Sequence, residues 1–294
     1  MKKPKPGPET VAGILRKVYD RLKKAGVFNP YVTAEVLLSE ALSVPRAELY
    51  LAPEKKPRKT QRARIMRWTA QREKRVPLSY VLGKTWFREI ELAITPAVLV
   101  PRQETELLVE EAIKLVKAGT GIVKIQDLGT GSGAIILSLA YELKDLGRQL
   151  QFFASDLSGP ALKIARRNAR KLGLEKNIDF RRGDLLEPFA REKFDLVICN
   201  PPYIPEKELP RLMPEVSKYE PRLALDGGKQ GLEVIKRLLV EAPAHLNSSG
   251  LLLLEIGKGQ SSKLQSVESG SLKLERTIPD YQRVERIAVF HQSP

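Results

Sequence analysis

The sequence contains one cysteine and two histidines in 294 residues. Cys199 alone can form neither an internal disulfide nor a cysteine metal cluster. With only His245 and His291 besides, a histidine-based metal site is not expected, so the predicted chemistry uses no metal. Apolar runs such as Leu251–Leu254 are far too short to cross a bilayer. The basic start MKKPKPGPE is followed by no apolar segment, which argues against a signal peptide and favours a soluble, cytoplasmic protein without a membrane partner.

Acidic residues are scarce in the first third of the chain. Residues 1–90 hold 21 Lys and Arg against 8 Asp and Glu, which gives +13 of the total net charge of +15. A basic region joined to a nearly neutral one suggests a polyanionic partner, such as RNA or a ribosome-associated protein. A solvated basic face that only aids solubility would give the same count, so both interpretations stay open.

Apolar periodicity separates an N-terminal helical region from the rest. Residues 1–8 are expected to be disordered, and helical spacing predicts helices over 9–25, 33–42 and 60–75, with a proline-containing connection over 44–59. Residues 1–76 are therefore predicted to form a small all-helical domain. The period falls to about two in WFREIELAI (86–94), which predicts a β-hairpin within a linking segment, 77–100.

After a helix that starts behind Pro101, strands and helices alternate. Strands are expected at 123–128, 151–155, 178–181, 194–199, 250–256 and 285–290, and helices at about 133–143, 160–172 and 230–244. This alternation predicts a mostly parallel, doubly wound sheet. The fold class is therefore α/β, with residues 101–294 as a Rossmann-like domain.

Glycines occupy alternate positions where the first of these strands ends, in VKIQDLGTGSGAIILSLA (123–140). Such a turn lets a ligand approach the backbone and the unpaired N–H groups of the following helix, and it occurs in NAD, FAD and S-adenosylmethionine (SAM) sites. The spacing D-x-G-x-G-x-G differs from the dinucleotide pattern G-x-G-x-x-G, and Asp127 suits a cationic amino-acid group better than a second phosphate. The turn is therefore predicted to bind SAM through Gly129, Thr130, Gly131, Ser132 and Gly133.

Two further acids follow the next two predicted strands. Asp156 is placed to accept hydrogen bonds from both ribose hydroxyls of a bound nucleoside. Asp184 can accept one from the adenine amino group, with Leu185 against the ring. Each acid can instead cap a helix or turn, and LSGPAL after Asp156 fits such a cap. Three acids at consecutive strand ends beside a glycine turn favour a SAM-binding domain; methyl transfer from SAM gives S-adenosylhomocysteine as the second product.

The strand FDLVIC (194–199) ends on Asn200-Pro201-Pro202-Tyr203. The Asn side-chain carbonyl and the peptide carbonyl after it offer two fixed acceptors for a planar NH2 group, on which Tyr203 can stack. Held in this way, the nitrogen lone pair points at a sulfonium methyl, and its developing charge is stabilised. These four residues are predicted to be catalytic and substrate-binding, with Asn200 also beside the cofactor. A proline-rich turn is the structural alternative, and the motif alone does not separate adenine N6 from a glutamine amide.

The chain resembles the release-factor glutamine methyltransferases (the HemK/PrmC family). Six blocks carry the resemblance: VPLSYVLG (76–83), LVPRQETELLV (99–109), DLGTGSGAI (127–135), NPPYIP (200–205), YEPRLALDGGKQGLEVIKRLL (219–239) and LLLEIGKGQ (252–260). The resemblance implies SAM-dependent methylation of the side-chain N5 of the glutamine in the Gly-Gly-Gln (GGQ) tip of class-1 peptide chain release factors, which tunes translation termination. It also implies that the helical residues 1–76 contact the release factor; a monomer is expected.

The resemblance assigns the same residues to SAM, adenine and the glutamine amide as the motifs do. It further implies that Arg102, Glu104 and Glu106 shape the active-site wall, although a structural Arg–Glu pair is equally compatible with this block. Glu220 and Pro221 are expected in a loop that helps to close the site. Leu185 stands where family members often carry an aromatic residue, which would alter stacking on adenine.

Two other functions fit part of the pattern. An N6-adenine methyltransferase acting on RNA or DNA would explain the basic N-terminal region, but it leaves the PR-x-ETE block unexplained. A non-catalytic SAM- or RNA-binding protein would keep the fold, but an intact Asn-Pro-Pro-Tyr sequence argues against lost chemistry. The sequence therefore predicts a SAM-dependent protein-(glutamine-N5) methyltransferase.

Overall fold

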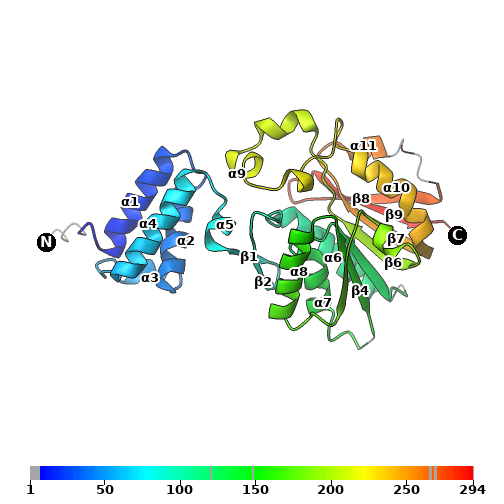
Figure 1. Cartoon of the computed structure of the whole chain (residues 1–294), viewed down its shortest axis with the longest axis horizontal. Helices are drawn as coiled ribbons and strands as arrows, with labels where there is room; N and C mark the ends of the chain where they lie inside the picture. The colour runs from blue at the N-terminus through cyan, green and yellow to red at the C-terminus, as the bar shows by residue number, and fades with distance from the viewer. Residues whose placement is uncertain (1–6, 120, 148, 265–266, 268–269, 294) are drawn as a thin grey trace. The chain divides into compact units, whose positions relative to one another are not determined.

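The computed structural model describes residues 7–119, 121–147, 149–264, 267 and 270–293. Of the segment predicted to be disordered, residues 1–6 lie outside this range. The chain forms two compact units, Met1–Gly83 with Met213–Tyr219, and Lys84–Leu212 with Glu220–Pro294 (Figure 1). No helix within the described residues is both long and apolar enough to span a membrane. The proposed domain limits at 76 and 100 stay predictions, and no sequence pattern indicated that 213–219 belongs to the first unit.

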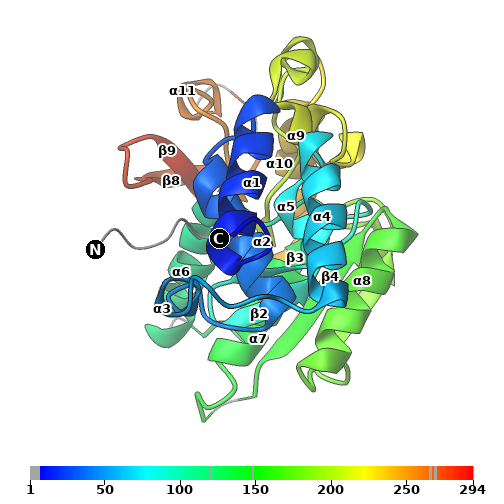
Figure 2. The same cartoon turned by 90° about the vertical axis from the view of Figure 1, so that its left-hand side faces the viewer.

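The first unit is helical: α1 (Val11–Lys24), α2 (Pro30–Leu42), α3 (Glu48–Leu51), α4 (Lys59–Glu73), α5 (Leu78–Leu82) and α9 (Pro214–Ser217). Figure 2 shows α1, α2 and α4 packed side by side. The apolar stripe of α1 is buried, and it forms one core with α2 and α4 through Val11, Ile14, Leu15, Val18, Leu22, Leu37, Leu38 and Ile65. Thr10 caps α1, since its Oγ1 accepts a hydrogen bond from the Gly13 amide at 3.2 Å. The three long predicted helices are therefore confirmed.

Three short helices of this unit were not predicted. α3 lies in the segment expected to be a connection, 44–59, and α9 lies where no element was predicted. α5 lies within the linking segment 77–100, ahead of the stretch 86–94 from which the hairpin was predicted. Pro77 precedes the helix and Gly83 ends it with a φ of 74°, so one turn of helix fits between them.

The segment Met213–Tyr219 is held in the first unit by charge. Both oxygens of Glu215 accept hydrogen bonds from Arg75, at 2.7 and 2.6 Å, and the buried Arg72 donates a third at 3.2 Å. Tyr219 donates through its hydroxyl to the Lys74 carbonyl at 2.6 Å. A bidentate Arg–carboxylate pair of this kind fixes geometry as well as charge.

The second unit contains a seven-stranded sheet in the order β5-β4-β3-β6-β7-β9-β8. Its strands are β3 (Lys124–Leu128), β4 (Gln151–Asp156), β5 (Ile178–Arg182), β6 (Phe194–Cys199), β7 (Leu246–Glu255), β8 (Leu272–Pro279) and β9 (Glu285–Gln292). β5, β4, β3, β6 and β7 are parallel, and β9 is antiparallel to β7 and β8. The predicted α/β fold with a mostly parallel sheet is confirmed. β8 was missed, because the alternation of Leu272, Leu274 and Ile278 is interrupted at Arg276 and only Leu272 is buried.

The other elements of this unit surround the sheet. β1 (Lys84–Phe87) and β2 (Ile90–Ala93) form the predicted hairpin as a separate two-stranded sheet. The helices are α6 (Gln103–Lys117), α7 (Ala134–Glu142), α8 (Gly159–Lys171), α10 (Glu233–His245) and α11 (Ser261–Leu264), with 3-10 turns η1 (Glu187–Phe189), η2 (Glu206–Arg211) and η3 (Arg222–Ala224).

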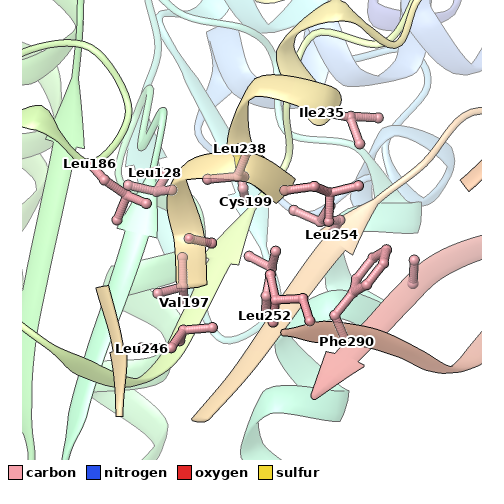
Figure 3. Packing of buried hydrophobic residues seen from close by; sticks show 14 of the residues in the cluster. Leu128, Leu186, Val197, Cys199, Ile235, Leu238, Leu246, Leu252, Leu254 and Phe290 are labelled. Carbon is pink, nitrogen blue, oxygen red and sulfur yellow. The ribbon is translucent and has the colours of Figure 1, made fainter. Parts of the chain in front are cut away.

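One face of the sheet packs on α10. Ile235 and Leu238 of α10 belong to one cluster with buried side chains of four strands, β3, β6, β7 and β9, as Figure 3 shows: Leu128, Val197, Cys199, Leu246, Leu252, Leu254 and Phe290. Burying a side chain of this size stabilises the fold by about 1.5–3 kcal/mol, so this cluster fixes the strand ends in relation to one another. The single polar residue inside β6, Asp195, lies at a register irregularity and accepts hydrogen bonds from the Val123 and Lys124 amides, at 2.9 and 2.8 Å. This polar break therefore anchors the start of β3.

Candidate active site

The carboxyl ends of β3, β4, β5 and β6 border a cavity of about 270 Å³. Strand order reverses between β3 and β6, which is where open α/β sheets bind ligands. Each strand end contributes to the wall, together with the segment before α6, the η3 loop and α10. The residues used below are Pro101, Thr105, Gly129, Thr130, Gly131, Ser132, Asp156, Ser158, Asp184, Leu185, Asn200, Pro201, Pro202, Pro221 and Arg237. Within the described residues, no three His, Cys, Asp or Glu side chains are grouped so as to hold a metal.

The predicted glycine turn forms the floor between β3 and α7. Gly129, Gly131 and Gly133 have φ values of 67°, 56° and 84°, which favour glycine. A Cβ on Gly129 would meet nothing within 4 Å, whereas one on Gly133 would lie 2.7 Å from Leu137 Cδ1. The first two glycines therefore leave the backbone open on the cavity side, and the third lets α7 begin. This open backbone at a helix N-terminus fits the close approach of a small polar ligand.

Asp127 lies behind this turn and is fully buried. Its Oδ2 accepts a hydrogen bond from Thr130 Oγ1 at 2.7 Å, and burial raises its pKa to about 7. Asp127 does not line the cavity, and its role toward a cationic group stays a prediction. Its side chain instead holds Thr130, which does line the cavity.

Asp156 lines the cavity and orients two loops. Its Oδ2 accepts from the Gly131 amide and its Oδ1 from the Ser158 amide, both at 2.8 Å. Burial raises its pKa. The cap of α8 is Ser158, whose Oγ accepts from Ala161 at 3.2 Å, so Asp156 does not serve as the helix cap. Each carboxylate oxygen keeps a further lone pair for a donor in the cavity, which suits a diol.

Asp184 and Leu185 lie together at the end of β5. Asp184 Oδ2 accepts from Arg237 Nη2 at 2.8 Å, and both side chains are partly exposed. Leu185 has a φ of 45°, and its carbonyl accepts from Ser155 Oγ at 3.0 Å. Arg237 was not predicted as a site residue, because it lies on α10, 53 positions along the chain from its partner.

Asn200 is held by a buried polar chain. Its Nδ2 donates to Thr105 Oγ1 at 3.0 Å, and Thr105 Oγ1 donates to Glu255 Oε2 at 2.6 Å. Tyr203 donates through its hydroxyl to the other oxygen, Glu255 Oε1, at 3.2 Å. Burial raises the pKa of Glu255 to about 7, although both hydrogen bonds act to lower it. One buried carboxyl thus ties Asn200, through Thr105, to Tyr203.

The four residues of the Asn-Pro-Pro-Tyr motif are not equally placed. Asn200, Pro201 and Pro202 line the cavity, whereas the ring of Tyr203 packs against the sheet core and is absent from the lining. Stacking of Tyr203 on a substrate therefore stays a prediction. Thr105 and Glu255 were missed as partners, although a lone acid in LLLLEIG and a threonine between two acids in QETE were visible signals.

Gly227 and Gly231, which follow the Asn-Pro-Pro-Tyr motif in the chain, lie where a side chain would clash with the backbone of the motif. A Cβ on Gly227 would lie 2.7 Å from the Pro202 carbonyl oxygen, and one on Gly231 would lie 2.3 Å from the Tyr203 carbonyl oxygen. Gln260 Nε2 donates to the carbonyls of both Tyr203 and Gly231, at 3.0 and 2.9 Å. These glycines therefore allow two backbone segments to touch just behind the motif.

The charged residues of the PR-x-ETE block do not form the cavity wall, so that expectation is wrong. Pro101 and Thr105 line it instead, since Glu104 and Glu106 flank Thr105 on a helix and point about 100° to either side. Glu106 accepts from the Arg88 amide at 3.2 Å. The Arg–Glu pair exists, but with a different acid.

That acid is Glu220, whose Oε2 accepts from Arg102 Nη2 at 2.5 Å. The Glu220 side chain is almost completely buried, and burial raises its pKa against the effect of Arg102. Its neighbour Pro221 lines the cavity, as expected for a loop that borders the site. The PR-x-ETE and YEP blocks are therefore joined by an ion pair across the cavity rim.

Comparison with known proteins found a family match for each of the two parts of the chain. Residues 14–83 match the PrmC N-terminal domain, and residues 121–240 match a methyltransferase domain. The chain is 40% identical over 274 residues to the release factor glutamine methyltransferase of Moorella thermoacetica, covering 92% of this chain and 95% of that protein. It is 39% identical over 251 residues to that of Geobacter sulfurreducens, covering 84% and 85%.

A solved structure shares the fold. The hMettl16 catalytic domain in complex with MAT2A 3'UTR hairpin 6 superposes with a TM-score of 0.51 at 14% identity, covering 79% of this chain and 81% of that one. At this identity the likeness extends to the fold alone. The two curated relatives are far closer and span nearly the whole chain. The chain therefore belongs to the release factor glutamine methyltransferase family.

Proposed function

We propose that this protein transfers a methyl group from SAM to the side-chain N5 of the glutamine in the GGQ motif of class-1 release factors. The observation that carries the proposal is the orientation of Asn200, whose Nδ2 is used by Thr105 while the residue lines the cavity. Its Oδ1 is thereby left to accept an N–H from a planar amide. Family membership supports glutamine as the source of that amide.

The cavity residues suit SAM. The open backbone of the Gly129–Gly133 turn would hold the amino-acid part, and Asp156 would accept from the ribose hydroxyls. Asp184 and Leu185 would border the adenine, with Arg237 close to its edge. When bound, SAM supplies an electrophilic methyl carbon on a positively charged sulfur.

The residues of the motif would act on the nucleophile. An amide nitrogen attacks poorly because its lone pair is delocalised into the carbonyl. Asn200 Oδ1 and a neighbouring backbone carbonyl would each accept one N–H, which fixes the nitrogen and stabilises the positive charge that it develops. The N–CH3 bond forms as the S–CH3 bond breaks, and the nitrogen then loses a proton. That proton becomes acidic only as the new bond forms, so the proposal requires no basic side chain.

We assign the remaining features to the partner. The helical residues 1–76 would recognise the release factor, and the excess of Lys and Arg there would also permit a weak contact with ribosomal RNA. Because release factors work on ribosomes, we place the activity in the cytoplasm. We propose that the protein acts as a monomer.

The test is mass spectrometry of the GGQ peptide after a class-1 release factor has been incubated with the protein and SAM. We expect one added methyl group on that glutamine, and none on a release factor whose GGQ glutamine is replaced by glutamate. An unmodified peptide, with methyl groups appearing instead in RNA or DNA incubated in parallel, would overturn the proposal in favour of the adenine alternative.

A further inference from the structure

The Thr105 hydroxyl has a single proton, and the structure shows where it goes. In the structure Thr105 donates to Glu255 Oε2, 2.6 Å away. This direction holds for the ionised carboxylate and for a carboxyl protonated on Oε1, because Oε2 is then an acceptor, whereas a proton on Oε2 would reverse the chain. The lone pairs of Thr105 Oγ1 then face Asn200 at 3.0 Å. They can only accept, so the hydrogen-bond chain has one direction.

This direction fixes the Asn200 amide. With the NH2 group toward Thr105, a donor meets an acceptor; with the amide reversed, Oδ1 would face the Thr105 lone pairs without a proton between them. Thr105 and Glu255 are 3% and 1% exposed, so water does not readily replace the missing bond. The buried carboxyl of β7 thus selects which end of the Asn200 side chain is left for a ligand.

The same carboxyl also restrains the far end of the motif through Tyr203. Arg286 of β9 and Glu104 of α6 act on Glu255 electrostatically with opposite sign. α6, β6 and β7 are thereby connected through one buried group.

We propose that Thr105 and Glu255 are positioning residues that present the Asn200 side chain as a hydrogen-bond acceptor, which selects a substrate nitrogen that carries protons. This inference rests on the proposed function, since it concerns the same site. Neither residue needs to touch the reacting atoms. They act only through Asn200, so substitutions at Thr105 or Glu255 should change the methylation rate only while Asn200 is present.

The experiment compares single-turnover rates of release-factor methylation. Thr105→Val removes the hydroxyl at constant shape and should slow transfer about 3- to 10-fold, the size of one neutral hydrogen bond, with the Kd for SAM unchanged within about 2-fold. Thr105→Ser should restore the rate. Glu255→Met frees the Thr105 proton and should lower the rate, whereas Glu255→Gln can still offer Thr105 an acceptor and should lower the rate less. Ser138→Ala removes another buried hydroxyl, in α7, and is the matched control.

A double-mutant cycle separates positioning from general damage. In an Asn200→Ala background, Thr105→Val should cause no further loss, because its effect passes through Asn200. Losses that multiply in the double mutant, or a Thr105→Val enzyme with the wild-type rate, would overturn the inference while leaving the proposed function intact.

A second measurement does not depend on the substrate. In the wild-type protein, the Asn200 side-chain NH2 protons should exchange slowly with water by NMR, since one of them is bound to Thr105. Exchange as fast as that of an exposed Asn would overturn the inference even if Thr105→Val failed to fold. Slow exchange in a protein that leaves the release factor unmethylated would refute the proposed function alone.

Discussion

Gly231 offers a sharp test of how the second unit holds its Asn-Pro-Pro-Tyr motif. In Gly231→Ala the new Cβ would lie 2.3 Å from the Tyr203 carbonyl oxygen, where ordinary contact begins near 3.4 Å. One of the two backbones must therefore shift by about 1 Å, and the Gln260 bridge between the two carbonyls would be strained. The left-handed backbone at Gly231, with a φ of 74°, adds a cost of about 1–2 kcal/mol for a side chain.

Gly173 provides the matched control. Its φ is 73°, but a Cβ there would meet nothing within 4 Å. Gly173→Ala should therefore lower the free energy of unfolding only by the cost of a side chain in the left-handed conformation, about 1–2 kcal/mol. Gly231→Ala should lower it by a further 1–3 kcal/mol or so, the usual cost of overpacking.

The two variants should also separate in activity. A displacement of about 1 Å near reacting groups can cost on the order of 100-fold in rate, so Gly231→Ala should slow methyl transfer 10- to 100-fold, with little change in SAM affinity. Gly173→Ala should keep the wild-type rate. Denaturant titration and single-turnover kinetics check both points. If the two variants have the same stability and the same rate, the close approach of 2.3 Å has no energetic meaning and the reasoning is refuted.

Three further predictions concern the cavity and its buried acids. Asn200→Ala should slow single-turnover transfer about 100- to 1000-fold, to a residual rate that is still measurable, while calorimetry gives a SAM Kd within a few-fold of wild type; a large loss of SAM binding would contradict its assignment to the amide. Asp156→Asn should weaken SAM binding about 10-fold or more, since bonds to a charged acceptor are worth about 1.5–3 kcal/mol, and an unchanged Kd would remove it from the cofactor site. Burial raises the pKa of Glu255 from 4.5 to about 7, so the folded protein keeps this proton over a pH range in which the unfolded chain has lost it. The free energy of unfolding should therefore fall as pH rises from about 4.5 to 7. Denaturant titrations at pH 5 and pH 8 should show that Glu255→Gln reduces this fall by a few kcal/mol. An equal change in the free energy of unfolding between the two pH values in both proteins would argue against this pKa.

The elements that the sequence predicted well are those with a long, regular period. The stripe of α1 and the apolar runs of β6 and β7 each span enough residues for local pattern to decide the structure. The short helices α3 and α5 have no such period, and Arg276 interrupts the period of the edge strand β8, so tertiary packing decides these three elements.

Some residues of the candidate site could be predicted from the sequence, and others could not. Gly129, Asp156, Asp184 and Asn200 follow strand ends, and parallel strands bring their carboxyl ends to one edge of a sheet, so their meeting at one cavity could be anticipated. Thr105 lies 150 positions from Glu255, and no local pattern links them. Buried ion pairs and hydrogen bonds over such separations depend on the packed fold, which is why this connection appears only in the structure.

The segment Met213–Tyr219 makes the helical unit a discontinuous one. Cutting the gene after residue 83 would not yield two self-sufficient products. A fragment of residues 1–83 would leave Arg72, which is 4% exposed, without its carboxylate, and a fragment of 84–294 would carry Glu215 without either arginine. A chimera that exchanges the helical unit between relatives must therefore carry residues 213–219 from the same parent. The helical unit is inherited as two pieces of sequence, not one.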